Sequence, residues 1–254
     1  MLDSFKVEAE KRGYDITFIN HNISGRSMTY LEHCHYRSVD GVVIACVNFY
    51  DPQVVELVNS DVPVVTIDHV FNNRMAVLSD NVAGLKALVK QAWACGHRRI
   101  AFIHGEKTSV TENRIAGFYQ ACEELGLEIP EEYVRDGVYH DVERCAEETR
   151  ALLALPQRPT CIIFPDDFSA LGGYNALAEA GLSIPDDISV MGYDGIYLSR
   201  VVNPSLVTYQ QNTAALGQTA ADKLIELIEH PRVTLPEQIR VSGRLLLGRS
   251  VRSL

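Results

Sequence analysis

The sequence predicts an α/β fold built on doubly wound parallel sheets, and three observations support this class. Short runs rich in β-branched residues alternate with amphipathic helical patterns along the chain. Several runs are continuously apolar, which is typical of parallel strands covered by helices on both faces. Glycine follows several helical stretches and marks where they end. In such folds the crossovers are right-handed, and ligands bind at the carboxyl ends of the strands.

The expected elements follow one another in chain order. One helix places Val82, Leu85 and Leu88 on a single face, and Gly96 follows it as a stop signal. The strand pattern occurs at residues 15–20, 41–46, 62–67, 99–104, 134–138, 160–164 and 188–192. The clearest helical patterns cover residues 81–95, 112–125, 168–180 and 213–229.

The composition limits the size of the hydrophobic core and the kinds of partner that the chain can bind. The chain has 254 residues, 46% of them hydrophobic, which is enough for one large core or two smaller ones. Its formal net charge is −10, whereas duplex DNA rewards clustered Lys and Arg because affinity comes largely from phosphate neutralisation. We therefore do not expect these residues to bind nucleic acid by themselves.

The cysteines and the N-terminal residues indicate a compartment. Six cysteines are scattered without a C-x-x-C pair, and several lie inside apolar runs, where a thiol behaves as a small hydrophobe. This usage fits a reducing compartment better than a disulfide framework. No apolar signal-peptide core and no stretch of ~20 apolar residues is found. We expect a soluble cytoplasmic protein with no membrane partner.

Catalytic signatures are missing from the sequence. It contains no phosphate loop, G-x-G-x-x-G, G-x-S-x-G or H-E-x-x-H motif, so we expect no enzyme and no cofactor. His33-Cys34-His35 suggests a soft metal site, but its spacing matches no common zinc pattern, and we expect no metal. His97 is expected to be structural, at a helix-to-strand turn. His104 ends a strand on the ligand side and is a candidate ligand contact.

Three segments of the chain carry a family resemblance. They are Asp80-Asn81-x-x-Gly84 with the later GHRRIAFI, then Asn113-Arg114-Ile115-Ala116-Gly117-Phe118, and residues 159–223 with IPDDISVMGYD. Any one of them is weak, but their order and spacing are specific. Together they resemble the effector-binding core of the lac-repressor/gal-repressor (LacI/GalR) family of bacterial transcription regulators, and the resemblance covers about residues 5 to 250.

The resemblance implies a periplasmic-binding-protein-like architecture. It has two doubly wound parallel-sheet lobes joined by three crossovers, with a ligand in the cleft. We expect an N-terminal lobe of residues 1–79 plus 211–236 and a C-terminal lobe of residues 80–210 plus 237–254, with crossovers near 79, 210 and 236. The implied function is to sense a small polar effector, a sugar above all, and to modulate DNA binding. The implied assembly is a homodimer.

Two residues lead the predicted ligand site. Asp194 follows an apolar strand, and a carboxylate there accepts hydrogen bonds from two adjacent hydroxyls, which suits a sugar. Arg114 offers a planar fork of donors. The resemblance implies that both contact the ligand. The alternatives are a turn aspartate in Tyr193-Asp194-Gly195 and a solvated arginine in the first turn of a helix.

Five further residues complete the predicted ligand set, His104 among them. Asp166 departs from the asparagine usual in the family, and we expect one residue of Asp166-Asp167 to cap a helix while the other faces ligand. Gln211 lies near a crossover and reaches either ligand or hinge. Tyr139 and Phe71 are candidate stacking surfaces for a sugar ring, or else packing residues, and Asn72 is a weaker candidate.

Family members begin with a helix-turn-helix headpiece that enters the major groove of operator DNA. Nothing here matches it, so we expect operator DNA to be a partner only through a headpiece that these residues lack. The first strand of the N-terminal lobe also has no match. Two alternatives stay open: a sugar-binding protein of an ABC transporter, which shares the architecture, and a glycosidase using Asp166 and Asp194.

Overall fold

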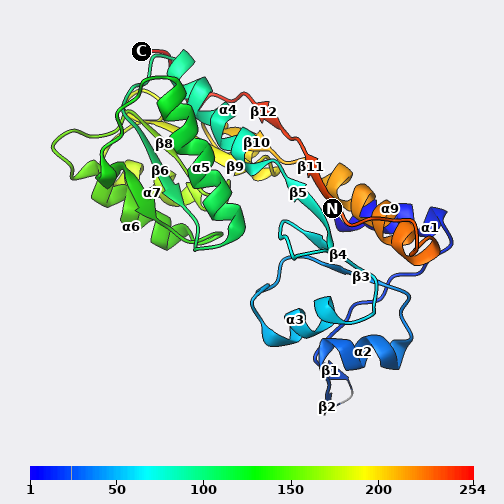
Figure 1. Cartoon of the computed structure of the whole chain (residues 1–254). Helices are drawn as coiled ribbons and strands as arrows, with labels where there is room; N and C mark the ends of the chain where they lie inside the picture. Colours follow the sequence, from blue (N-terminus) through cyan, green and yellow to red (C-terminus); the bar gives the residue numbers. More distant parts are fainter. Residues whose placement is uncertain (24) are drawn as a thin grey trace. The chain divides into compact units, whose positions relative to one another are not determined.

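The computed structural model describes residues 1–23 and 25–254, which pack into two compact units (Figure 1). Unit 1 consists of residues 1–79 and 212–241, and unit 2 of residues 80–211 and 242–254. Each unit holds its own parallel sheet with helices on both faces, so the α/β doubly wound fold class is confirmed. The last crossing between units lies after Val241, later than the expected 236, because residues 238–241 form a strand of unit 1.

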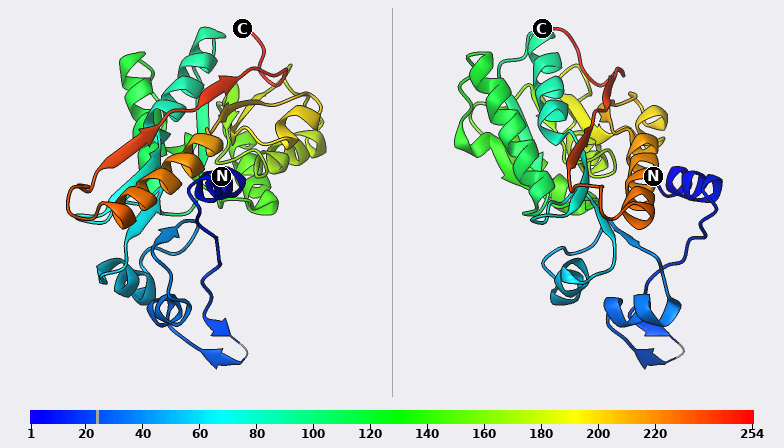
Figure 2. Two further views of the ribbon diagram at one scale, coloured as in Figure 1. Left: turned by 90° about the vertical axis from the view of Figure 1, so that its right-hand side faces the viewer. Right: turned by 45° about the vertical axis from the view of Figure 1, so that its right-hand side comes forward.

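Unit 1 has a four-stranded sheet in the order β11-β5-β4-β3, with all neighbours parallel. Val65 and Ile67 of β4 pack on α9, whereas Val64 packs toward α2 and α3, because side chains alternate between the faces of a strand. Helix α1 lies beside α9 (Figure 2). The elements are α1 (Leu2–Lys11), β1 (Asn22–Ile23), β2 (Arg26–Ser27), α2 (Tyr30–Arg37), β3 (Val42–Ile44), α3 (Pro52–Asn59), β4 (Val64–Ile67), β5 (Met75–Ser79), α9 (Thr213–Glu229) and β11 (Gln238–Val241).

Unit 2 has a six-stranded sheet in the order β12-β10-β9-β8-β6-β7, in which β12 alone runs antiparallel. The elements are α4 (Asn81–Ala94), β6 (Ile100–His104), α5 (Ser109–Glu124), the 3-10 helix η1 (Glu131–Tyr133), β7 (Val134–Asp136), α6 (Val142–Leu153), β8 (Cys161–Ile163), α7 (Ala170–Glu179), β9 (Ser189–Asp194), α8 (Leu198–Val201), β10 (Val207–Gln210) and β12 (Arg244–Leu246).

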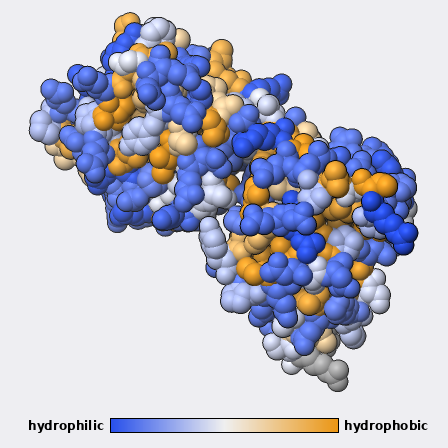
Figure 3. Space-filling model, in the orientation of Figure 1, coloured by the Kyte–Doolittle hydropathy of each residue, from blue (hydrophilic) through white to orange (hydrophobic). Residues whose placement is uncertain are grey.

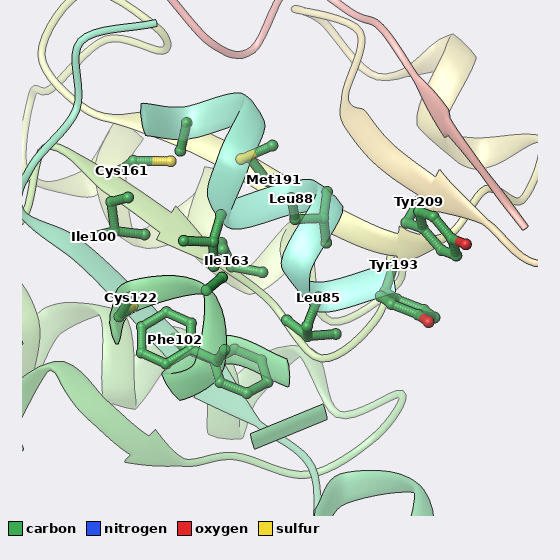
Figure 4. Close-up of a cluster of buried hydrophobic side chains, with 14 of the residues drawn as sticks. Leu85, Leu88, Ile100, Phe102, Cys122, Cys161, Ile163, Met191, Tyr193 and Tyr209 are labelled. Carbon is green, nitrogen blue, oxygen red and sulfur yellow. The ribbon is translucent and has the colours of Figure 1, made fainter. Parts of the chain in front are cut away.

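The core of unit 2 explains why its strands are continuously apolar. Ile100 and Phe102 of β6 pack under α4 and α5, in the cluster shown in Figure 4, whereas Ala101 and Ile103 pack under α6 and α7. Both faces of the sheet are therefore covered by helices, and both sets of side chains are almost fully buried. On the face seen in Figure 3 the surface is mainly hydrophilic, with apolar side chains scattered among polar ones.

One expected strand is wrong. Residues 15–20 form neither helix nor strand, and Phe18 in their middle is 66% exposed. Within the described residues, β3 pairs with β4 alone and is an edge of its sheet, so no ladder engages residues 15–20. A β-branched run becomes a strand only where a neighbouring strand takes up its backbone hydrogen bonds.

The last residues of the chain are fastened to unit 2. Ser250 is fully buried and its hydroxyl connects two strands, donating to the Val190 carbonyl at 2.6 Å and accepting from the Val207 amide at 2.8 Å. The amide of Leu254 donates to the Cys95 carbonyl at 2.8 Å. His97 is buried with Nε2 3.1 Å from the Arg252 carbonyl oxygen, and burial lowers its pKa. The structural role expected for His97 is therefore to hold this tail.

Candidate ligand-binding site

Polar side chains gather at the carboxyl edge of the unit 2 sheet. Asp194 is the last residue of β9, and His104 is the last residue of β6. Asp166 follows β8, and Gln211 follows β10. These strands are parallel neighbours, so their carboxyl ends share one edge, which is where open α/β sheets bind ligands.

Arg114 of α5 is buried at this edge, with 4% of its surface exposed. Its Nε donates to Asn81 Oδ1 at 2.9 Å, and its Nη1 donates to the Pro165 carbonyl at 2.7 Å. The guanidinium carbon lies 3.6 Å from the centre of the Tyr193 ring, which is labelled in Figure 4. The planar fork is therefore held from several directions, and the alternative of a solvated arginine does not describe it.

Asp194 lies beside Arg114 and stays partly open to solvent. Its Oδ1 is 3.7 Å from Arg114 Nη2, and 22% of its side chain is exposed. The same oxygen accepts a 2.5 Å hydrogen bond from Gln211 Nε2. Asp194 therefore forms an ion pair with a buried cation, and the exposed part of its carboxylate can still accept hydrogen bonds.

The two adjacent aspartates are both buried, each at 1% exposure. Asp166 accepts hydrogen bonds from the Ser169 amide at 2.8 Å, the Ser169 hydroxyl at 2.7 Å and the His140 amide at 2.9 Å. It therefore caps the turn that leads into α7, which is one half of the expectation for this pair. A ligand contact of Asp166 stays a prediction. Asp167 points into the protein, toward Thr208 and Ile196.

Tyr139 and His104 lie at the same edge. The Tyr139 hydroxyl is 2.9 Å from Thr111 Oγ1, its ring centre is 5.4 Å from the Arg114 guanidinium, and burial raises its pKa. His104 has Nδ1 2.8 Å from the Gly105 carbonyl oxygen and Nε2 3.2 Å from Asp136 Oδ1, with 14% of the side chain exposed. Tyr139 thus belongs to the group around Arg114, whereas His104 contacts the Gly105 carbonyl and Asp136 instead.

Phe71 belongs to unit 1, after the carboxyl end of β4. Its ring lies 4.7 Å from the His69 ring, and that ring is stacked on Phe49 at 4.4 Å. Asn72 follows in a loop that lines an open pocket of about 400 Å³ together with residues 236–238. The expected stacking role of Phe71 stays a prediction. Phe71 lies in a cluster of three rings with Phe49 and His69.

Sequence reasoning missed two residues of this site. Asn81 accepts a hydrogen bond from the Arg114 guanidinium, and the Tyr193 ring lies against that guanidinium. A signal existed for both: a side chain at Gly84 would clash with Tyr193, since its Cβ would lie 2.2 Å from the Tyr193 hydroxyl oxygen. The Asn-x-x-Gly spacing therefore keeps room for the ring under the arginine.

His33, Cys34 and His35 are consecutive on α2 and do not converge. Nδ1 of His33 lies 2.9 Å from the Asn20 backbone, Cys34 is in the core of unit 1, and His35 is exposed. Within residues 1–23 and 25–254, no three His, Cys, Asp or Glu side chains gather as a metal site would require. No helix of this part of the chain is long and apolar enough to cross a membrane.

Comparison with known proteins adds to this geometry. Residues 89–251 match the family model of the periplasmic binding protein-like domain. The chain is 30% identical to the HTH-type transcriptional repressor PurR of Haemophilus influenzae, over 100% of this chain and 77% of that protein.

Two solved structures are similar over nearly the whole chain. A LacI family transcriptional regulator from Enterococcus faecium with bound ribose has a TM-score of 0.83 and 26% identity, covering 99% of this chain and 92% of that one. The complex of the transcriptional regulator CelR with cellobiose has a TM-score of 0.85 and 24% identity, covering 97% and 76%. The second likeness, at this identity, concerns the fold.

Proposed function

This chain belongs to the LacI/GalR family of transcription regulators, and from that premise we propose that it senses a small neutral sugar through the Asp194 site of unit 2. The observation that carries the proposal is the pair of Arg114 and Asp194. The arginine is buried and fixed, whereas the carboxylate keeps 22% of its side chain exposed. A site of this kind offers acceptors to hydroxyl groups without a net charge that would demand an ionic ligand.

The recognition chemistry follows from the exposed groups. Asp194 accepts hydrogen bonds from two neighbouring hydroxyls of a sugar, and Gln211, hydrogen-bonded to it, fixes the direction of its Oδ1. The Tyr139 ring, 5.4 Å from the Arg114 guanidinium, offers a surface for the apolar face of the sugar. The solved relative with bound ribose supports this ligand class.

The proposed output is a change in operator binding. The ligand favours one of two states of the regulator and shifts their balance by its difference in affinity for them, typically about 1–3 kcal/mol of coupling. Operator DNA is a proposed partner through a helix-turn-helix headpiece, and a homodimer is the proposed assembly. The net charge of −10 supports the view that DNA contacts come from elsewhere than these residues.

The test is a thermal-shift screen with ribose, cellobiose, ribose 5-phosphate and adenine, because a ligand that binds the native state raises the melting temperature. We expect ribose or cellobiose to give the largest shift. Asp194→Ala should weaken binding of that sugar by about 10–100-fold or more in calorimetry, since each hydrogen bond to a charged group contributes about 1.5–3 kcal/mol.

Glu123→Ala is the matched control, because it removes an exposed carboxylate of α5. It should leave both affinity and melting temperature unchanged. If neither sugar shifts the melting temperature, the sugar class is wrong. If Asp194→Ala binds as well as the unmodified chain, the assignment of the site is wrong.

A further inference from the structure

The turn that carries Asp194 has an unusual backbone. Asp194 has φ +97° and Gly195 has φ +68°, so two consecutive residues lie in the left-handed region. Glycine adopts this region freely, but a residue with a side chain does so only where its surroundings hold it there. Something in unit 2 must therefore stabilise the conformation that directs the Asp194 carboxylate.

Asp167 forms hydrogen bonds with this turn on both sides of Asp194. Its backbone amide donates to the carbonyl of Tyr193 at 2.8 Å, just before Asp194. Its Oδ2 accepts from the amide of Ile196 at 2.8 Å, just after the turn, and its Oδ1 accepts from the Thr208 hydroxyl at 2.5 Å. One buried side chain thus connects the loop after β8, the end of β9 and strand β10.

The remaining contacts leave the turn little freedom. The Gln211 amide donates to the Asp194 carbonyl at 3.2 Å, and Gln210 Nε2 donates to the Gly195 carbonyl at 3.3 Å. A Cβ at Gly192 would lie 2.3 Å from Asp167 Oδ1, and a Cβ at Gly195 would lie 2.4 Å from Gln210 Cβ. The carboxylate of Asp167 therefore packs directly against the backbone of Gly192, and any side chain at that position would displace it.

We propose that Asp167 is a positioning residue of the ligand site, which holds the Asp194–Ile196 turn and thereby sets the direction of the Asp194 carboxylate. The inference rests on the proposed function, because it concerns the same site. Asp167 is 1% exposed and both its oxygens are engaged within the protein, so it acts through Asp194 and does not touch ligand.

This arrangement makes ligand affinity depend on pH. Burial, helped by the nearby Asp194, raises the pKa of Asp167 to about 7, although the hydrogen bonds from Thr208 and Ile196 oppose the rise. The charged and titratable groups that face Asp167 are Asp194 at the end of β9 and Tyr174 of α7. Protonation puts a hydrogen on one oxygen and takes an acceptor away from the turn or from Thr208. Affinity should fall as the pH drops through about 7.

The first arm of the test needs no ligand. The amide signal of Ile196 is followed by nuclear magnetic resonance from pH 5.5 to 8.5 in the unmodified chain, in Asp167→Asn and in Thr208→Val. We expect a titration with a midpoint near 7 in the unmodified chain. In Asp167→Asn the titration should disappear and the amide should exchange at least about tenfold faster, since the group that accepts its hydrogen bond has changed.

Thr208→Val provides a second variant that keeps the carboxylate. Because the Thr208 hydrogen bond lowers the pKa of Asp167, its loss should move the midpoint upward. If Asp167→Asn does not fold, the shift of the titration midpoint in Thr208→Val tests the proposal by itself. An Ile196 amide that titrates and exchanges in Asp167→Asn as it does in the unmodified chain overturns the proposal, and so does an unchanged midpoint in Thr208→Val.

The second arm measures binding of ribose and cellobiose between pH 6 and 8. We expect affinity to rise with pH in the unmodified chain, and Asp167→Asn to bind about tenfold more weakly with no such rise. His104 and His140 are retained in that variant, so a pH dependence that persists in it counts against Asp167. If neither sugar binds while the Ile196 amide behaves as expected, the turn-holding role is supported and the proposed ligand class is rejected.

Discussion

The two units present different chemistry at the carboxyl ends of similar parallel sheets. In unit 2 this edge carries a buried arginine, two buried aspartates and the partly exposed Asp194, each held by hydrogen bonds to other groups of the unit. In unit 1 the corresponding edge carries the rings of Phe49, His69 and Phe71, which contact one another at 4.4–6.3 Å. Burial lowers the pKa of His69, which favours its neutral form.

The difference shows what each edge can contribute to recognition. Charged groups held by several hydrogen bonds are directional, so they select for the positions of hydroxyls. Rings are less directional and supply contact area. A buried charge also costs more to disturb than a ring contact, so substitutions in unit 2 should be the more damaging ones.

The largest effect is expected for Arg114→Ala. The substitution removes donors from the Pro165 carbonyl and Asn81 Oδ1, and it removes the cation beside Asp194. Removing one partner of a buried charged pair costs about 3–5 kcal/mol. The free energy of unfolding in urea should fall by this amount. The fluorescence of Trp93 follows it, because the chain has one tryptophan and it lies in α4 of unit 2.

Arg114→Lys is the control, since it keeps the charge and loses the planar fork. It should recover part of the stability and little of the sugar affinity. A loss below about 1 kcal/mol in Arg114→Ala, which is typical of an exposed ion pair, would remove the contrast between the units.

An intermediate effect is expected from pH, through Asp167. Its pKa is about 7 in the folded protein against an ordinary value of 3.8, so between these pH values the folded state binds more protons than the unfolded one. Stability from this group is therefore complete at low pH and is lost as the pH rises toward 7, by up to about 1.4 kcal/mol per pH unit. Ligand affinity should change in the opposite direction.

Urea unfolding at pH 5, 6 and 7 measures this slope, and Asp167→Asn should make it shallower. The carboxylate would then be a group that favours binding at the expense of stability. The same slope in both proteins would assign the pH dependence to other groups and would show that the pKa of Asp167 is not raised in the folded protein.

The smallest effect is expected for Phe71→Ala in unit 1. Its ring is partly exposed and contacts the His69 and Phe49 rings at 4.7 and 6.3 Å. Such ring pairs contribute about 0.5–1.5 kcal/mol beyond area burial, so the free energy of unfolding, followed by circular dichroism, should fall by about 1–2 kcal/mol. Phe71→Leu should recover most of the apolar burial. A loss as large as that of Arg114→Ala would mean that the rings are as tightly coupled as the charges.

Much of the fold was predictable because buried parallel strands have a one-dimensional signature. Cys161–Ile163 is apolar at every position since both faces of β8 are covered, and the sequence indicates it directly. Residues 15–20 are also rich in β-branched residues, but pairing depends on a partner strand elsewhere in the chain, which the local pattern does not report.

The site was predictable as a set of residues more than as a geometry. Arg114 and Asp194 could be named from the resemblance, but their 3.7 Å contact and the ring of Tyr193 beneath the arginine depend on tertiary packing. Two adjacent aspartates are indistinguishable in sequence. The direction of each side chain after β8 decides that Asp166 caps a turn while Asp167 supports another.

The way the chain is divided between its units has a consequence for synthesis on the ribosome. Strand β5 pairs with β11, so Ala76 gains its neighbour only when Gln238 has been synthesised. In the same way, the carbonyl of Cys95 gains its hydrogen bond only from the later Leu254. Domains usually fold in order as they emerge, the N-terminal one first. Here neither unit can be completed in that order, because each needs a late segment. One edge of β5 therefore stays unpaired until β11 has been synthesised, and an unpaired strand edge is open to non-native pairing during that time.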